Sequence, residues 1–206
     1  MSNQPTKRPM PEAVIFDLDG TLVSSNLDFR TICEQAGCVP GQDILRYMET
    51  LPLEERSRVS QIIHDHEMAD ALSCEVLPGV KAMLKALELK NIRMAIVTRN
   101  SASATQIKLA RTGIALKHVI TREDAPPKPA PDALINLAKQ WGIEQKSCVY
   151  VGDYIYDIEA AHRANMHAAL YSDASLPDFA DQAHFVFRHH DEFEEVLMDY
   201  WHSLAF

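Results

Sequence analysis

Short apolar runs that stop abruptly at acidic or turn-forming residues constrain the fold of this 206-residue chain more than any other feature. The first run, AVIF at residues 13–16, ends in DLDG. Comparable runs cover residues 92–98, 118–121, 148–153 and 167–171, and a shorter one over 184–187 suits an edge strand. A continuous apolar run bounded by turn residues is typical of a strand buried on both faces of a parallel sheet. We therefore expect these runs to form one sheet.

Apolar residues at helical spacing separate these runs. This spacing predicts helices over residues 80–89, 101–112, 131–141 and 157–164. Gly113 and Gly142 follow two of them, where glycine is a common C-cap. Strands that alternate with helices predict an α/β fold with a doubly wound parallel sheet.

One stretch, residues 24–77, interrupts the alternation because it has no strand-like run. Helical patterns cover residues 27–35, 43–49 and 53–72. We expect a small inserted helical cap over 24–77, above the carboxyl edge of the sheet, where such folds bind ligands. The remaining boundaries follow: a flexible tail over 1–11, and an α/β core made of 12–23 and 78–206.

The bulk composition excludes several classes of function. The chain is 47% hydrophobic, with a formal net charge of −9. An acidic surface of this kind repels nucleic acids and anionic membranes. The N-terminal residues lack the apolar core of a signal peptide, and no apolar stretch approaches the ~20 residues that span a bilayer. We expect a cytoplasmic protein, monomeric or homodimeric, without a nucleic-acid or membrane partner.

The cysteines and several histidines of the chain do not predict a metal site. The HDHE string at residues 64–67 lies in a predicted helix, where residues two apart do not share a face, so we expect a polar surface. His189 and His190 suit a surface turn. The cysteines form no CxxC pair or zinc-ligand spacing, so we expect reduced thiols; they are Cys33, Cys38, Cys74 and Cys148.

Carboxylates gather at two of the predicted strand ends. Asp17 and Asp19 follow the first run, Asp153 ends the run at 148–153, and Asp157 lies four residues further on. Carboxylates this close repel one another unless a cation lies nearby or one of them stays protonated. Hard oxygen ligands at this density suit Mg²⁺, which keeps some waters and leaves room for a substrate phosphate.

Four motifs in fixed order resemble those of the haloacid dehalogenase superfamily. The string FDLDGTLV resembles the DxDGT motif of its phosphatase members, and Thr98 in IVTRN matches the second motif. Lys128 in PPKPAP matches the third, and GDYIYD at residues 152–157 matches the fourth. The resemblance covers nearly the whole chain after Glu12. The insertion after the first motif matches the cap position of the subfamily that includes phosphoglycolate phosphatases and β-phosphoglucomutases.

The resemblance implies a Mg²⁺-dependent phosphatase that acts on a small phosphorylated metabolite. Asp17 would be the nucleophile and would form an aspartyl-phosphate. Asp19 would protonate the leaving oxygen and then take a proton from water. Asp17, the backbone carbonyl of Asp19, and Asp153 would hold Mg²⁺, with Asp157 supporting the metal shell. The second aspartate also argues for phosphate chemistry, because the dehalogenases of the family lack it.

The same resemblance implies a set of phosphate ligands. Thr98 and Lys128 would hydrogen-bond the phosphoryl oxygens. Arg99 and Asn100, directly after Thr98, would contact the phosphate or the substrate, although a solvated loop is an equally good interpretation of both. Taken alone, Thr98 is an ordinary strand-end hydroxyl and Lys128 an ordinary loop lysine. Only the ensemble of motifs favours the catalytic interpretation.

Two other functions are compatible with these motifs. A sugar phosphomutase would use the same residues but would need a second phosphate site in the cap, where no basic cluster is obvious in the sequence. A non-catalytic phosphate-binding protein would share the fold, since one fold hosts many functions. All the catalytic residue types are present, however, which favours an enzyme.

Overall fold

A computed structural model describes residues 10–204 of the chain. Most of the tail predicted over 1–11 lies outside the described residues; of the two that are described, Met10 packs against the core and Pro11 is buried. None of the helices within 10–204 is both long and apolar enough to cross a bilayer.

A six-stranded sheet in the order β3-β2-β1-β4-β5-β6 forms the centre of the molecule, and all its neighbouring strands are parallel. The predicted doubly wound parallel sheet is therefore confirmed. The strands are β1 (Ala13–Phe16), β2 (Arg93–Val97), β3 (His118–Ile120), β4 (Cys148–Gly152), β5 (His167–Tyr171) and β6 (Phe185–Phe187).

The register of the central strands brings the motif residues to one edge. Phe16 of β1 pairs with Ile96 of β2 and with Val151 of β4. Asp17, Thr98 and Asp153 therefore follow three adjacent parallel strands at nearly the same level.

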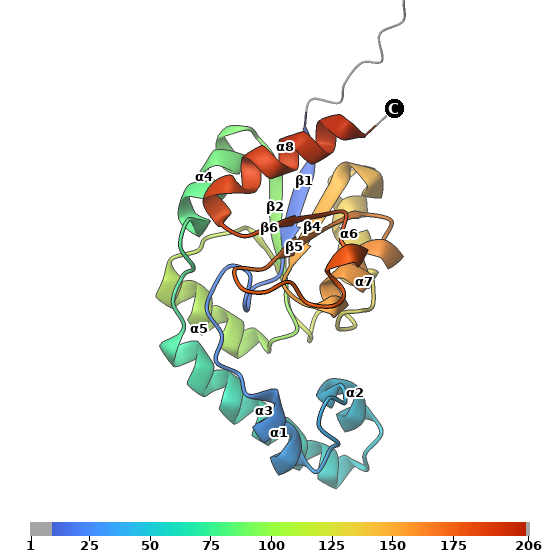
Figure 1. The fold of residues 1–206 in the computed structure, drawn as a ribbon. Coiled ribbons are helices and arrows are strands. Elements are labelled where there is room, and N and C mark those ends of the chain that lie inside the picture. Colours follow the sequence, from blue (N-terminus) through green and yellow to red (C-terminus); the bar gives the residue numbers. More distant parts are fainter. Residues whose placement is uncertain (1–9, 205–206) are drawn as a thin grey trace, which may run out of the picture.

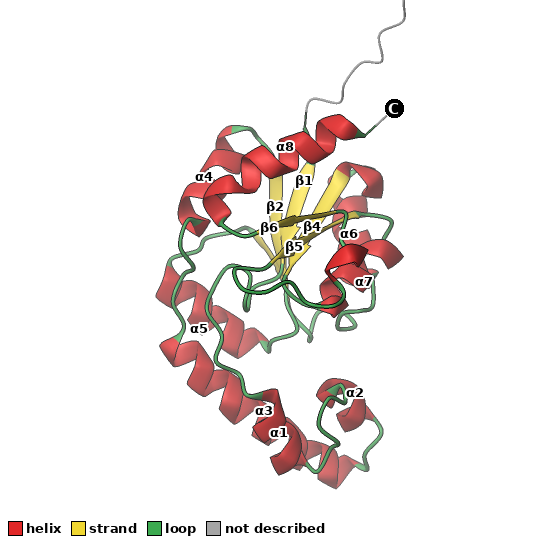
Figure 2. Ribbon diagram, in the orientation of Figure 1, coloured by secondary structure: helices red, strands yellow, loops and turns green. Residues whose placement is uncertain are grey.

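Helices cover both faces of the sheet (Figure 1 and Figure 2). The two faces alternate along β1, because neighbouring residues in a strand point to opposite sides. Val14 and Phe16 belong to the apolar cluster that includes α4 and α8, whereas Ala13 and Ile15 belong to the cluster that includes α6 and α7. These helices are α4 (Val80–Leu89), α8 (Phe193–Ser203), α6 (Asp132–Trp141) and α7 (Ile155–Arg163). Three short 3-10 turns complete the core: η1 (Gln145–Ser147), η2 (Ala180–Gln182) and η3 (His190–Glu192).

Three helices lie between β1 and α4 and project from the sheet (Figure 1). They are α1 (Phe29–Ala36), α2 (Ile44–Glu49) and α3 (Leu53–Ser73). They enclose an apolar cluster separate from those of the sheet, to which Ile32, Ile44 and Val59 belong. The long helix α3 lies against α5 (Ala102–Thr112), which joins this helical unit to the core. In the rest of the article, cap means α1, α2 and α3 with their connections.

The structure pairs Cys33 with Cys38 in a disulfide, which corrects the prediction of reduced thiols for these two residues. The reason is local. Gly37 ends α1 in the left-handed conformation (φ 84°), and the backbone amides of Gly37 and Cys38 both donate to the Cys33 carbonyl. This C-terminal turn brings the two Cα atoms to 4.8 Å. Cys74 and Cys148 are free and buried.

Candidate active site

Asp17 lies directly after β1, with its amide donating to the Val151 carbonyl at 2.8 Å. Its side chain is 12% exposed, and one carboxylate oxygen lies 2.7 Å from the Lys128 ammonium. Burial raises the pKa of Asp17 to about 7, with repulsion from Asp157 and Asp19 adding to the rise and Lys128 partly opposing it. A nearly buried carboxylate with one edge open is suited to nucleophilic attack on a bound substrate.

Three carboxylates meet beside Lys128. Asp17, Asp153 and Asp157 each offer an oxygen atom, and these atoms lie within 4.8 Å of one another. Burial raises the pKa of Asp153 well above its usual range, and repulsion from Asp157 and Asp17 raises it further. A cation among these oxygens would relieve that repulsion, and an all-oxygen carboxylate set fits Mg²⁺. In the described part of the chain this is the only such group of acidic, histidine or cysteine side chains, so the HDHE string forms none.

Asp157 is the most heavily hydrogen-bonded of the three acids. Its Oδ1 accepts from Lys128 at 2.6 Å and from the Tyr150 hydroxyl at 3.2 Å. Its Oδ2 accepts from the Tyr154 backbone amide at 3.0 Å. Asp157 thus orients Lys128, which in turn bridges to Asp17.

Two glycines make room for these acids. A Cβ atom on Gly152 would lie 2.2 Å from Asp157 Cγ, closer than real contacts allow. A Cβ atom on Gly20 would lie 2.3 Å from an Asp153 carboxylate oxygen, and Gly20 also has a φ of +69°. The close approach of backbone and carboxylate therefore requires glycine at both positions, at the end of β4 and in the loop after β1.

Thr98 and Asn100 form the second strand-end loop. The Thr98 amide donates to the Ile120 carbonyl at 2.9 Å, which continues the pairing of β2 with β3. The Thr98 hydroxyl oxygen accepts from the backbone amide of Asn100 at 3.1 Å. The Asn100 side chain in turn donates to a carboxylate oxygen of Asp19.

Asp19 has partners different from those of the three clustered acids. One oxygen accepts from Asn100 and the other from Lys108 of α5. Burial raises the pKa of Asp19, although the Lys108 charge and hydrogen bonds from Lys108 and Asn100 oppose the rise. The pKa of Lys108 is also raised: burial lowers it, but the charge of Asp19 and hydrogen bonds to Asp19 and Asp70 outweigh burial.

Lys108 is absent from the residues that sequence reasoning selected, because its neighbours on that face of α5 are small or polar and predict no buried side. Ala104, Lys108 and Thr112 follow one another at a spacing of four, so they share one face of α5, and all three are buried. Only the structure shows that this face is buried, and a buried lysine needs an anionic partner.

Arg99 points to the cap in this structure. Its guanidinium forms a two-pronged ion pair with Asp43, with N–O distances of 2.5 and 3.0 Å, and lies 4.7 Å from the centre of the Tyr156 ring. Asp43 also caps the N-terminus of α2 by accepting from the Leu45 and Arg46 amides. Arg99 therefore links the loop after β2 to the cap, and its contact with a phosphate stays a prediction.

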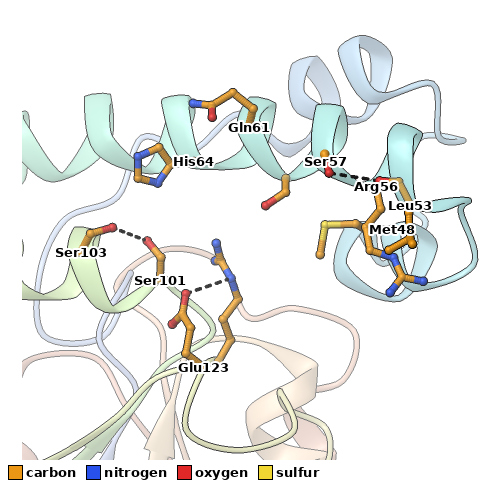
Figure 3. Close-up of a pocket in the computed structure, with 11 residues that line it drawn as sticks. Met48, Leu53, Arg56, Ser57, Gln61, His64, Ser101, Ser103 and Glu123 are labelled. Carbon is orange, nitrogen blue, oxygen red and sulfur yellow. Dashed lines mark hydrogen bonds and ion pairs between the residues drawn. The ribbon is translucent and has the colours of Figure 1, made fainter.

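An open pocket of about 590 Å³ lies between the cap and the core. Figure 3 shows Ser57, Gln61 and His64 of α3 across from Ser101, Ser103 and Glu123. Arg122, which also lines it, is ion-paired with Glu67 of α3. The lining further includes Met48, Leu53, Arg56 and Ser60. The motif acids do not line this pocket, but Ser101 directly follows Asn100, whose side chain donates to Asp19.

His190 is buried, which corrects the expectation of a surface turn. Its Nε2 lies 2.7 Å from the carbonyl oxygen of Thr21, and the centre of its ring lies 4.3 Å from that of the Tyr171 ring, with the two planes tilted by 39°. The unpredicted helix α8 explains the difference, because its first residue, Phe193, packs into the core and draws the preceding turn η3 inward.

Comparisons with known proteins give matches over most of the chain. The family model described as haloacid dehalogenase-like hydrolase matches residues 14–171. A phosphoglycolate phosphatase of Nitrosococcus oceani is 30% identical over 75% of this chain and 81% of its own length. A haloacid dehalogenase-like hydrolase domain-containing protein of Arabidopsis thaliana is 28% identical over 76% of this chain and 69% of its own length.

Solved structures share the fold. A hydrolase from Pseudomonas syringae superposes with a TM-score of 0.76 at 22% identity, over 91% of this chain and 98% of its own. A protein from Haemophilus somnus, described as a predicted phosphoglycolate phosphatase, gives 0.71 at 20% identity, over 90% and 97% of the two chains. A protein from Thermotoga maritima, described as a β-phosphoglucomutase, gives 0.66 at 21% identity, over 91% and 99%.

Proposed function

Because the chain belongs to the haloacid dehalogenase-like hydrolase family, we propose that it is a Mg²⁺-dependent phosphatase that hydrolyses small phosphate monoesters through Asp17. One observation carries the proposal. The Lys128 ammonium lies 2.7 Å from Asp17 and 2.6 Å from Asp157, at the edge of a three-carboxylate cluster. A nucleophilic carboxylate, a fixed cation and an oxygen-rich metal site together suit the transfer of a dianionic phosphoryl group.

In the first step an Asp17 carboxylate oxygen attacks phosphorus, and the bond between phosphorus and the ester oxygen breaks. Asp19 gives its proton to the departing oxygen. In the second step water attacks the aspartyl-phosphate while Asp19 takes the proton of that water, which restores Asp17 and releases phosphate. The raised pKa of Asp19, caused by burial, supports a carboxyl group that serves as both acid and base.

Asp17, Asp153 and the backbone carbonyl of Asp19 would hold Mg²⁺, and Asp157 would support this metal shell. The ion would neutralise charge on the phosphoryl oxygens as attack proceeds. Lys128 supplies a further positive charge from the protein itself, and the Thr98 hydroxyl donates to a phosphoryl oxygen.

The substrate that we propose is a small phosphorylated metabolite, as in the phosphoglycolate phosphatases among the relatives. The cavity between cap and core supports this size class, because its volume of about 590 Å³ suits a small molecule. Its serine, glutamine and histidine side chains favour a polar leaving group.

A sugar phosphomutase is less well supported by the cap. Two cap arginines that could bind a second phosphate donate to cap carbonyls instead: Arg56 to Glu49 and Leu51, and Arg58 to Gln35 and Ala36. Arg30 pairs with Glu34 on its own helix.

The test is phosphate release from 4-nitrophenyl phosphate and a panel of small phosphate esters, with Mg²⁺ and after chelation. We expect turnover that requires Mg²⁺ and is lost in Asp17→Asn, by more than about 10³-fold, because the nucleophile is removed. Asp181→Asn, which neutralises an exposed acid, is the matched control and should retain activity.

Other outcomes have distinct meanings. Interconversion of sugar phosphates faster than release of phosphate would replace the proposal with a mutase. Binding of phosphate esters and Mg²⁺ without turnover of any ester would replace it with a non-catalytic phosphate-binding protein.

A further inference from the structure

Lys108 is a lysine whose side chain is wholly enclosed by protein. It stands on α5, outside the four family motifs, and its exposed fraction is 0%. Removing an ammonium group from water is costly unless buried anions accept its hydrogen bonds. Lys108 has two such partners, the carboxylates of Asp19 and Asp70, and the distance to Asp70 is 2.5 Å.

Asp70 fixes the far side of this ammonium. It lies near the end of α3 with its side chain 3% exposed. Its Oδ1 accepts from the Asn26 backbone amide at 2.6 Å, and its Oδ2 accepts from the Ser25 hydroxyl at 3.3 Å as well as from Lys108. The carboxylate is thus held by the connection that leaves the loop after β1, and it cannot turn away from Lys108 without losing these bonds.

Asp19 is held from two sides by this arrangement. Lys108 donates to one of its oxygens and Asn100 donates to the other. Each carboxylate oxygen has two lone pairs, so both bonds leave room for a proton on the side that faces a substrate. The Asp19 side chain is 18% exposed, whereas that of Lys108 is 0% exposed, so the acid reaches solvent and the lysine does not.

We propose that Lys108 is a positioning residue: braced by Asp70, its ammonium holds the Asp19 carboxyl where it can pass a proton to the leaving oxygen of the ester. The inference rests on the proposed phosphatase function. Lys108 itself makes and breaks no bond. As the bond between phosphorus and the ester oxygen breaks, its electron pair stays on the leaving oxygen, which takes the proton from Asp19.

The proposal predicts that the effect of losing Lys108 depends on the leaving group. 4-Nitrophenolate departs readily without a proton, whereas an alkoxide requires one. In Lys108→Met we expect kcat/KM to fall by about 100-fold for an alkyl ester such as phosphoglycolate, within the range that general acid catalysis supplies. For 4-nitrophenyl phosphate the fall should be several times smaller. KM should change little for both esters, because Thr98 and Lys128 would hold the phosphoryl group.

Three other variants complete the experiment. Asp70→Asn keeps the ammonium but weakens its brace, and should show the same leaving-group pattern with a smaller loss. Asp19→Asn removes the acid itself, so it should show the largest difference in loss between the alkyl ester and 4-nitrophenyl phosphate. Arg111→Met is the matched control: Arg111 lies on the same helix and donates to the Cys74 carbonyl at 2.9 Å rather than to Asp19. It should show no preferential loss with the alkyl ester.

A crystal structure of Lys108→Met provides a readout that does not depend on turnover, and the Asp19 carboxyl should leave its wild-type position there. Asp70→Asn provides both readouts if Lys108→Met does not fold. An equal loss for both esters, or an unmoved Asp19, would overturn the inference while leaving the phosphatase in place. A wild type that releases phosphate from no ester would overturn both proposals.

Discussion

At the scale of single residues, two buried lysines organise four acids. Lys128 lies between Asp17 and Asp157, and Lys108 lies between Asp19 and Asp70. Burial lowers the pKa of Lys128, but the charges of Asp157 and Asp17 more than compensate, so its pKa is raised and it stays charged. Each cation offsets repulsion that would otherwise force the acids to protonate or separate.

The contact between Gly152 and Asp157 leads to a prediction at this scale. In Gly152→Ala the new methyl group would meet the Asp157 side chain, with 2.2 Å between Cβ and Cγ. Asp157 would shift, and with it Lys128. We expect a loss of about 1–3 kcal/mol in the free energy of unfolding, typical of overpacking, together with a large fall in kcat. Urea unfolding and phosphate release measure the two effects.

Gly41→Ala is the matched control for this prediction. Gly41 has a φ of +87°, but no heavy atom lies within 4 Å of its Cβ position. The change should cost about 1 kcal/mol of stability through backbone strain alone, with kcat retained. If Gly152→Ala matched wild type in both measurements, the site would not require the close approach of Asp157 to the backbone.

At the scale of elements, the turn η3 and the helix α8 pack against the loop after β1. The His190 ring donates to the Thr21 carbonyl, since a carbonyl oxygen can only accept, and it packs between the rings of Tyr171 and Phe187. Burial lowers the pKa of His190, while hydrogen bonds to the Thr21 and Pro78 carbonyls and the nearby Asp191 and Asp173 partly oppose this.

The lowered pKa of His190 predicts a loss of stability in acid. As pH falls, the unfolded chain takes up this proton before the folded protein does. The contribution of His190 to the free energy of unfolding is therefore complete above pH 6.5, the ordinary pKa of histidine. It declines as pH falls from there towards the lowered pKa of His190 in the folded protein. The slope from this one group is at most about 1.4 kcal/mol per pH unit.

Urea unfolding from about pH 8 to about pH 5 measures this effect, because that pH range covers the titration of histidine. His190→Gln should have a shallower dependence on pH than the wild type. The exposed His202→Gln should keep the wild-type dependence. Equal slopes in wild type and His190→Gln would show that other groups cause the acid sensitivity.

At the scale of the whole molecule, the cap has an apolar cluster of its own. Ile32, Ile44 and Val59 belong to it, whereas the sheet has one cluster on each face. Ion pairs join the two parts: Arg99 with Asp43, Arg122 with Glu67, and Lys108 with Asp70. Apolar clusters usually mark the units that open together, so we expect cap and core to differ in local stability.

Ile32→Ala tests that separation. Ile32 is 2% exposed, and its truncation should destabilise the cap by about 2–5 kcal/mol. Hydrogen exchange should accelerate over α1, α2 and the adjoining part of α3, with β1 and β4 unchanged. Ile96→Ala, in a sheet cluster, should instead accelerate exchange throughout the core. Equal acceleration of cap and sheet in Ile32→Ala would mean that the molecule opens as one unit.

The sequence alone determined most of the elements and, through its four motifs, the family of the chain. Apolar runs and helical spacing are local patterns, so β1, β2 and β4 and the helices from α1 to α7 appear close to their predicted positions. Asp17, Thr98 and Asp153 could be placed at one edge because parallel strands end on the same side of a sheet. The gathering of Asp17, Asp153 and Asp157 agrees with that expectation.

Only the tertiary structure decided which groups are partners. Lys108 is 89 residues from Asp19, and Arg99 is 56 from Asp43, so no local pattern joins them. The burial of His190 depends on the packing of α8 into the core, and the disulfide depends on the left-handed turn at Gly37. Periodicity reports which face of an element is buried. The partner of a buried charge is set by distances between elements, which exist only once the chain has folded.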